Sequence, residues 1–325
     1  MARKNMRRLK KLGVLVALPL ALATTGCGSD AGSAQSSVAE LVTTWGTTGA
    51  REGQFQYIED LAVAPNGSIY ATDAANSNVQ VFDKDGKFLT KFVTKGDGTD
   101  NDQMLKPEGI AVDKDGNVYV ADYTTGYIKK FTKDHKWVKT FGGYGSGPGQ
   151  NSEAEFMGIG PNNLLYMAEA GNGEVDVFDL DGKFQFSFGG KGNGPGQMNR
   201  PGTARINSRG QVVVADLANN RVNIYDLQGK FLKSFGSEGS GPGQMKLPAG
   251  IAIDEKDNIF VSEIGNDRIQ MFDKDGKSLA AWGSKGSKPG QFGNPHGLLY
   301  HQGHLYVADS ANDRVQKFKI NQPKS

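Results

Sequence analysis

The sequence has few of the residues that build disulfides and metal clusters. Its 325 residues include a single cysteine, Cys27, and four histidines. One cysteine excludes an intrachain disulfide, a thiolate metal cluster and a C-x-x-C-H haem attachment site. A zinc site needs three or four converging ligands, so the small number of histidines argues against one.

The chain also lacks the common motifs for nucleotide binding and acyl transfer. The glycine-rich stretch GSGPGQ at residues 145–150 has no Lys-Ser or Lys-Thr pair and no helical apolar stripe after it. No G-x-S-x-G segment marks a nucleophilic serine. What the sequence has instead is repetition, because related stretches return at residues 49–54, 192–197, 239–244 and 286–291. Regular spacing of this kind indicates connectors between repeated units.

Net charge is small once the first 26 residues are set aside. Those residues contain six basic side chains and no acidic one, and the rest of the chain holds 31 basic residues against 35 acidic ones. A mildly acidic body argues against a nucleic-acid partner, because non-specific binding to nucleic acid depends on basic surface. We therefore expect no nucleic acid, RNA included, among the partners.

Residues 1–26 are typical of a secretory signal, with a basic start followed by an apolar core at residues 12–23 that is too short to span a bilayer comfortably. Cys27 follows Thr24, Thr25 and Gly26, and this ending resembles a bacterial lipoprotein signal, in which the cysteine becomes the lipidated N-terminus. Because Thr24 stands where such signals usually carry leucine, an ordinary signal cleaved nearby is the alternative. We predict an exported protein anchored through Cys27 to a membrane of the bacterial cell envelope, with residues 27–38 as a flexible tether.

Each repeated unit predicts four short strands. In the second copy, residues 106–142, the runs GIAV, NVYVAD, YIKKF and WVKTFG are rich in β-branched and aromatic residues and are separated by turn residues. The D-x-D-G segments that begin at Asp83, Asp113 and Asp273 look like calcium loops. None of them continues to a glutamate at the twelfth position, so hairpin turns are the better interpretation.

The end of the chain indicates a closed ring. An aromatic residue ends the third strand of each copy, at intervals of 46 to 49 residues: Phe82, Phe131, Phe178, Tyr225, Phe272 and Phe318. The sixth copy lacks a fourth strand, and AELVTTWG at residues 39–46 supplies a spare one. A last unit completed by the first strand leaves no exposed sheet edge. We therefore predict an all-β, six-bladed β-propeller over residues 39–320, with a C-terminal tail at residues 321–325.

The units resemble NHL repeats. The fifth copy contains GSGPGQM, LPAGIAID, DNIFVSE, NDRIQMF and DGKSLAAWG, and the resemblance covers residues 39–320. It implies the propeller fold but says little about function, because such propellers include partner platforms, sensor domains, RNA binders and a few enzymes. The amidating lyases of the family hold a metal with several channel histidines, whereas the matching ring here contains only His296.

Function on a propeller usually lies where loops converge on the central channel. The middle position of the P-x-G motif forms one candidate ring: Glu59, Glu108, Glu155, Gly202, Ala249 and His296. These glutamates are candidate ligand-binding residues, and solvated loop carboxylates are the alternative. A second candidate ring contains Arg221, Arg268 and Arg314. Each arginine follows an acid by five residues, so an ion pair within the blade is the alternative for them.

Together these features predict a non-catalytic platform that binds a protein partner or an envelope ligand on its channel face. We expect the propeller to be monomeric, with no cofactor and no catalytic residue. The alternative is a metal-dependent hydrolase or lyase, lactonase-like or amidating-lyase-like, that uses the channel glutamates with calcium or zinc.

Overall fold

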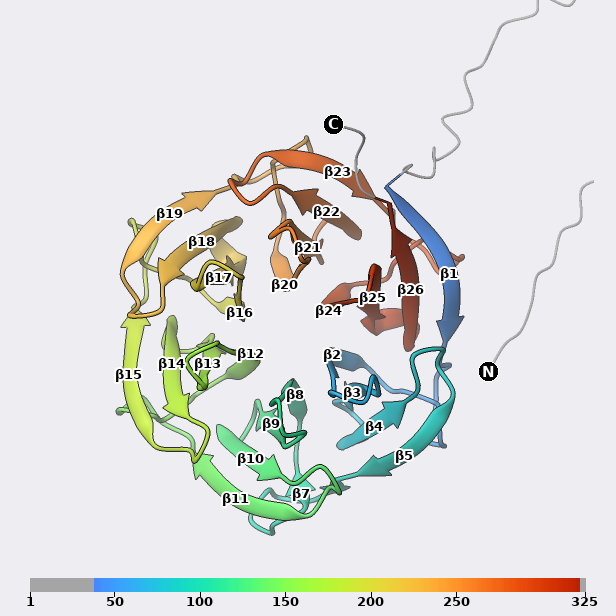
Figure 1. Cartoon of the computed structure of the whole chain (residues 1–325), viewed down its shortest axis with the longest axis vertical. Helices are drawn as coiled ribbons and strands as arrows, with labels where there is room; N and C mark the ends of the chain where they lie inside the picture. Colours follow the sequence, from blue (N-terminus) through green and yellow to red (C-terminus); the bar gives the residue numbers. More distant parts are fainter. Residues whose placement is uncertain (1–37, 322–325) are drawn as a thin grey trace, which may run out of the picture. The chain divides into compact units, whose positions relative to one another are not determined.

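The computed structural model describes residues 38–321, and strands form nearly all of their regular structure (Figure 1). Two short 3-10 helices are present within this range, η1 (Leu217–Asn219) and η2 (Ser310–Asn312). Neither is long or apolar enough to cross a membrane. Cys27, the predicted signal and nearly all of the predicted tether lie outside the described residues.

The described strands form six four-stranded antiparallel blades around a common centre (Figure 1). Blade 1 contains β2 (Ile58–Val63), β3 (Ile69–Asp73), β4 (Asn78–Phe82) and β5 (Phe88–Phe92). Blade 2 contains β8 (Pro107–Val112), β9 (Val118–Asp122), β10 (Tyr127–Phe131) and β11 (Trp137–Gly142). Blade 3 contains β12 (Ala154–Ile159), β13 (Leu164–Glu169), β14 (Glu174–Asp179) and β15 (Phe184–Gly189). Blade 4 contains β16 (Pro201–Ile206), β17 (Gln211–Asp216), β18 (Arg221–Asp226) and β19 (Phe231–Phe235). Blade 5 contains β20 (Pro248–Ile253), β21 (Ile259–Glu263), β22 (Arg268–Phe272) and β23 (Ser278–Trp282). Blade 6 contains β24 (Pro295–His301), β25 (His304–Asp309), β26 (Arg314–Ile320) and β1 (Ala39–Trp45).

The first strand of the chain completes the last blade, which confirms the predicted closure. β1 runs antiparallel to β26, from the pair Ala39 and Ile320 to the pair Trp45 and Val315. Elsewhere, each blade begins at its innermost strand and ends at its outermost one (Figure 1). Blades 3 and 4 are also joined by one parallel bridge, between Phe156 and Thr203. The all-β six-bladed propeller predicted from the repeats is confirmed.

The repeated turn motifs form as the sequence predicts. In the D-x-D-G turns the first aspartate accepts backbone N–H groups with one carboxylate oxygen, as Asp113 does from Asp115 and Asn117. Asp83 and Asp273 make the same turn. These segments are therefore hairpin turns, which is the interpretation that the sequence favours.

The glycine-rich connectors are also built from their own side chains. Gln150 accepts a hydrogen bond from the backbone N–H of Gly147 at 3.0 Å, and Gln197 and Gln244 do the same in the next two connectors. Gly149 has a φ of +71°, a conformation that glycine adopts without steric cost. The conserved shape of the connector thus explains why GPGQ recurs.

Aromatic residues fill the space between neighbouring blades. The aromatic residue on the outer strand of one blade packs against the residue that ends the third strand of the next. The ring centroids lie 5.2 Å apart for Phe92 and Phe131, and 4.8 Å apart for Phe188 and Tyr225. The last interface repeats the contact between Trp45 of β1 and Phe82, at 6.2 Å. The aromatic columns are core, as predicted.

Candidate functional site

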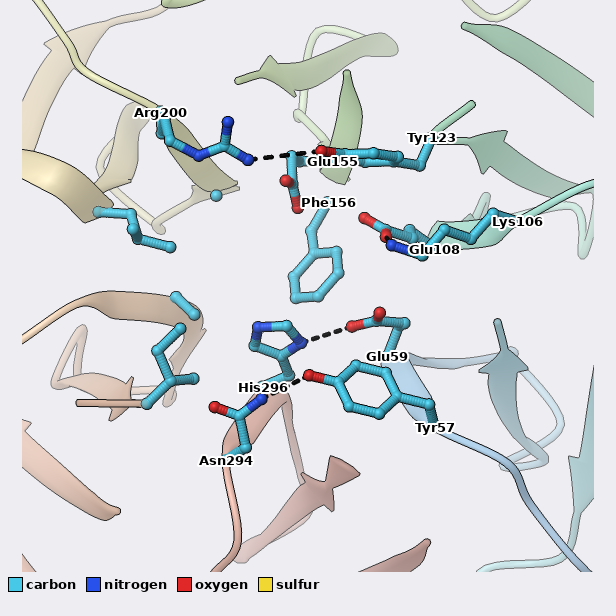
Figure 2. A pocket seen from close by; sticks show the side chains of 14 residues that line it. Tyr57, Glu59, Lys106, Glu108, Tyr123, Glu155, Phe156, Arg200, Asn294 and His296 are labelled. Atoms are coloured by element: carbon cyan, nitrogen blue, oxygen red, sulfur yellow. Dashed lines mark hydrogen bonds and ion pairs between the residues drawn. The ribbon is translucent and has the colours of Figure 1, made fainter. Parts of the chain in front are cut away.

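All six members of the predicted P-x-G ring line one cavity at the mouth of the channel where the innermost strands begin, and Figure 2 labels four of them, Glu59, Glu108, Glu155 and His296. Each is the second residue of an innermost strand, and each of these strands departs from regular pairing directly after its first residue. Such irregularities re-aim side chains out of the ladder. The six residues line one cavity of about 280 Å³, here called the glutamate pocket. Its complete lining consists of 14 residues: Tyr57, Glu59, Lys106, Glu108, Tyr123, Glu155, Phe156, Arg200, Gly202, Leu217, Ala249, Ile264, Asn294 and His296.

The glutamate pocket has a charged side and an apolar side. Blades 1 to 3 supply the three glutamates, with Lys106 beside them. Blades 4 and 5 supply Gly202, Leu217, Ala249 and Ile264, none of which carries a polar side chain, whereas Arg200, just ahead of blade 4, reaches to Glu153 and Tyr123. Ligand sites are usually concave, with an apolar lining and a few converging polar groups, and this pocket has that character.

His296 is paired with Glu59. The imidazole Nδ1 lies 2.5 Å from Glu59 Oε2, and the rings of Tyr57 and Phe156 stand edge-on to the imidazole (Figure 2). Burial opposes protonation of His296, but the charge and the hydrogen bond of Glu59 outweigh burial and raise the pKa of the imidazole. The pair therefore favours a charged histidine.

Glu108 is almost fully buried and forms an ion pair with Lys106. Burial, reinforced by the negative charge of Glu59, raises the pKa of Glu108 to about 8. The Lys106 ammonium also lies 4.2 Å from the centre of the Tyr123 ring, within the range of a cation–π contact. Lys106 thus has its own carboxylate and its own aromatic ring.

Glu155 is half-buried and differs from the other two glutamates in its partners. The nearest arginine, Arg200, forms an ion pair with Glu153 at 2.7 Å and donates to the Tyr123 hydroxyl at 3.4 Å. Burial, followed by the charges of Glu108 and Glu59, raises the pKa of Glu155 well above its ordinary value. The empty pocket therefore holds a proton on Glu155 more tightly than water would.

A buried ion pair crosses the channel away from the glutamate pocket. Arg205 of blade 4 donates to both carboxylate oxygens of Asp60 in blade 1, at 2.8 and 3.0 Å, and a further guanidinium N–H donates to the carbonyl of Met157. Arg205 lines a second cavity of about 190 Å³, together with Ile206, Leu298 and other residues that do not line the glutamate pocket. The two cavities are thus separate.

Comparison with known families identifies the fold. Residues 50–140 and 198–281, more than half of the chain, match a family model described as 6-bladed beta-propeller, and residues 292–318 match the NHL repeat. The chain belongs to this six-bladed propeller family. No curated protein sequence matches it.

Solved structures show the same propeller fold. Virginiamycin B lyase from Staphylococcus aureus has a TM-score of 0.61 and 16% identity, covering 87% of this chain and 98% of the lyase. A gluconolactonase from Xanthomonas campestris has a TM-score of 0.63 and 14% identity, covering 87% of this chain and 97% of that enzyme. A protein of unknown function from Bacteroides thetaiotaomicron has a TM-score of 0.65 and 16% identity, covering 87% and 76%. At these identities the similarity shows the fold alone.

The second predicted ring of the propeller does not reach the pocket. Arg221, Arg268 and Arg314 form ion pairs within their blades, with N–O distances of 2.7 to 2.8 Å to the acid five residues earlier. Each also donates to backbone carbonyls of the glycine-rich connector that precedes its blade. The ion-pair alternative is therefore the arrangement that the structure shows, and these arginines brace the connectors.

Eight residues that line the pocket were not predicted from the sequence, and four of them are Tyr123, Phe156, Leu217 and Ile264. The other four are Tyr57, Lys106, Arg200 and Asn294. All four occupy the position two residues before the predicted ring, just ahead of the innermost strand. Three of them, Tyr57, Arg200 and Asn294, have positive φ angles of 56° to 69°. This position could have been found from the sequence, because aligning the copies of the repeat shows that its residue type changes from blade to blade.

The described part of the propeller contains no group of three or more His, Cys, Asp or Glu side chains placed to hold a metal ion. The three glutamates and His296 line the same pocket, but Glu59 is paired with His296, Glu108 is paired with Lys106, and Glu155 forms no ion pair among the described side chains.

Proposed function

We propose that this propeller is an exported, membrane-tethered binding protein that receives part of an envelope ligand or protein partner in the glutamate pocket and does not convert it chemically. The observation that carries the proposal is the convergence of the ring positions of all six blades on one two-sided pocket. Tethering through Cys27 rests on the leader sequence, which lies outside the described residues.

The dimensions of the pocket support a small occupant. A volume of about 280 Å³ suits a small molecule, or a single side chain of a partner, better than a folded segment. Its charged and apolar sides suit an occupant with one polar and one apolar end.

A variant that fills the pocket tests this function. In four of the six blades the position of Ala249 carries glutamate or histidine, so the repeat accepts a large side chain there. Ala249→Phe is expected to occupy the apolar side of the pocket while the blades remain folded. We expect a ligand or protein that co-purifies with the tagged wild type from native membranes to be absent from Ala249→Phe, as measured by mass spectrometry.

The outer-strand substitution Leu232→Phe is a suitable control, because Leu232 is exposed and lies away from the pocket. An occupant retained equally by wild type and Ala249→Phe would contradict the proposal. So would the absence of any retained occupant in all three proteins.

A hydrolase or lyase is the second candidate, and two observations favour it. Glu59 and His296 form a hydrogen-bonded acid–base pair in the pocket, and the Glu108 carboxyl has a pKa of about 8, close to the range in which general acids work at neutral pH. Similar folds include a gluconolactonase and a virginiamycin B lyase, and a catalytically inactive His-to-Ala variant of that lyase has been solved with quinupristin.

Turnover and metal content decide between the candidates. Hydrolysis of a lactone or cleavage of quinupristin that is abolished by His296→Ala would establish an enzyme. Stoichiometric calcium or zinc that is lost in the double variant Glu59→Ala, Glu108→Ala would establish the metal-dependent form. On the binding proposal, neither turnover nor stoichiometric metal is expected.

A further inference from the structure

We propose that the group received by the glutamate pocket is an organic cation, a protonated amine on an apolar stem, with its ammonium beside Glu155 and its stem against the apolar side. The inference rests on the proposed binding function and specifies the chemistry of the occupant. It follows from which charges in the pocket are already matched.

The cations at the pocket each have their own acid. Lys106 is paired with Glu108, His296 with Glu59, and Arg200 with Glu153. Glu155 is the fourth carboxylate at this mouth, and no ion pair to it is formed among the described side chains. With every group ionised, the pocket therefore has a net charge of −1 that is assigned to Glu155, and a cation is the group that would match it.

An anion fits this site poorly. The nearby guanidinium and ammonium groups are engaged with Glu153 and Glu108, and an anion would have to break one of those pairs and face Glu155. The aromatic ring of Tyr123 adds a surface suited to a cation, as its contact with Lys106 shows.

The apolar side of the pocket determines the rest of the occupant. Leu217, Ala249 and Ile264 come from blades 4 and 5, across the pocket from the glutamates. Burying an alkyl chain there contributes about 0.8 kcal/mol per methylene in transfer terms, which corresponds to about a fourfold gain in affinity for each carbon. Affinity should therefore rise along a series of primary amines until the stem fills the pocket.

The empty site would balance its charge with a proton. Burial and the charges of Glu108 and Glu59 disfavour the ionised form of Glu155, so an arriving ammonium would promote release of a proton from this carboxyl. The titratable and charged groups that face this site from the surrounding elements are Tyr57, Glu59, Lys106, Glu108, Tyr123, Glu153, Arg200 and His296. Because primary amines keep their proton below about pH 10, binding should tighten as the pH rises until Glu155 is ionised in the empty pocket as well.

Titration calorimetry with hexylammonium, hexanol and hexanoate tests the proposal on the whole folded body. We expect hexylammonium alone to bind, with affinity increasing by up to about tenfold per pH unit from pH 6 to 8. Repeating the titration in two buffers of different ionisation enthalpy should reveal release of up to one proton per ligand bound. N-acetyl-lysine amide in the same assay tests whether a lysine side chain of a partner protein is an equivalent source of the cation.

Two variants locate the effect. Glu155→Gln keeps the shape of the side chain but removes its charge, and is expected to weaken hexylammonium binding by about tenfold or more and to abolish proton release. Glu174→Gln is the matched control, because Glu174 is a half-buried glutamate of the same blade that does not line the pocket. The pH dependence of the wild type remains a test even if Glu155→Gln fails to fold.

The outcomes separate this inference from the function beneath it. Binding of hexanol or hexanoate in place of hexylammonium, or of a neutral or anionic ligand co-purifying with the wild type but not with Ala249→Phe, would overturn the cation and leave the binding function intact. Hexylammonium binding that is independent of pH and unchanged in Glu155→Gln would overturn the role of Glu155. An empty wild type in both assays would remove the binding function itself.

Discussion

Asp176 shows how one residue can depart from the pattern of its repeat. It occupies the middle of the third strand of blade 3, where blades 1, 5 and 6 carry glutamines that donate to a connector carbonyl. Asp176 is buried, and its Oδ2 has no hydrogen-bond partner among the described residues. Burial, with smaller effects from Glu174 and Glu169, raises the pKa of Asp176 to about 8.

Replacing this carboxyl should stabilise the propeller. The pKa of Asp176 is higher in the folded state than its ordinary value of 3.8, so the folded state holds the proton more tightly. Its contribution to stability is full below about pH 4 and is lost as the pH rises toward 8. The free energy of unfolding of Asp176→Asn, measured in urea, should therefore be about 1–3 kcal/mol higher than that of wild type at pH 8, and the difference should be smaller at pH 5.

Asp181→Asn, on the exposed turn after the same strand, provides a control for the general effect of removing a negative charge. A gain in Asp176→Asn that is the same at both pH values would show that the raised pKa is not its source.

At the scale of elements, the connector between blades 1 and 2 is the exception that the sequence only partly reveals. Its copy lacks the GPGQ stretch and is two residues longer than the others, and the structure places β6 (Thr94–Lys95) and β7 (Gln103–Met104) there. Lys129 occupies the position in the third strand of blade 2 where blades 1, 5 and 6 carry glutamine. Its ammonium donates to the carbonyls of Gly98 and Asp100, so one long side chain holds the longer loop.

Removing that ammonium should loosen the connector selectively. Lys129 is buried, and Lys129→Met would keep the apolar stem but leave two carbonyls without their donor, at a cost of about 1–3 kcal/mol. Hydrogen–deuterium exchange is expected to increase at residues 96–102 and to stay unchanged in the GPGQ connectors. The exposed Lys91→Met is the control, and equal exchange in both variants would show that the ammonium does not hold the loop.

The repeat pattern predicted the elements well because each strand and turn is specified locally. Alternating apolar residues, Asp-Gly turns and the 47-residue period of the aromatic residues determine blades and closure without long-range information. The ring of Glu59 and its counterparts was predicted for the same reason. The pattern does not show how far a side chain reaches or which partner it finds. Arg221 was predicted as a candidate ligand-binding residue but pairs with Asp216, whereas Arg200, which was not predicted, lines the pocket.

At the scale of the whole molecule, stability depends on the joining of the two ends of the ring. Trp45 of β1 packs between Phe82 of blade 1 and Tyr306 of blade 6, with centroid distances of 6.2 and 6.0 Å. β1 also covers the edge of β26, which would otherwise expose unpaired backbone groups.

A chain that begins at residue 47 should therefore lose its cooperative unfolding transition and associate through the open edge. Size-exclusion chromatography and thermal melting of this truncation, beside a chain that begins at residue 38, would measure both effects. A monomeric truncation with an unchanged melting temperature would show that closure by β1 is not required.

The ion pair between Asp60 and Arg205 affects how a ligand could reach the glutamate pocket. The ion pair joins blades 1 and 4 across the central channel, and Phe156 lines the glutamate pocket. The channel is therefore not open along its whole length. On the proposed function, an occupant of the glutamate pocket would therefore enter and leave through the opening that the glutamates line, and the residues at that opening would set its rate of release.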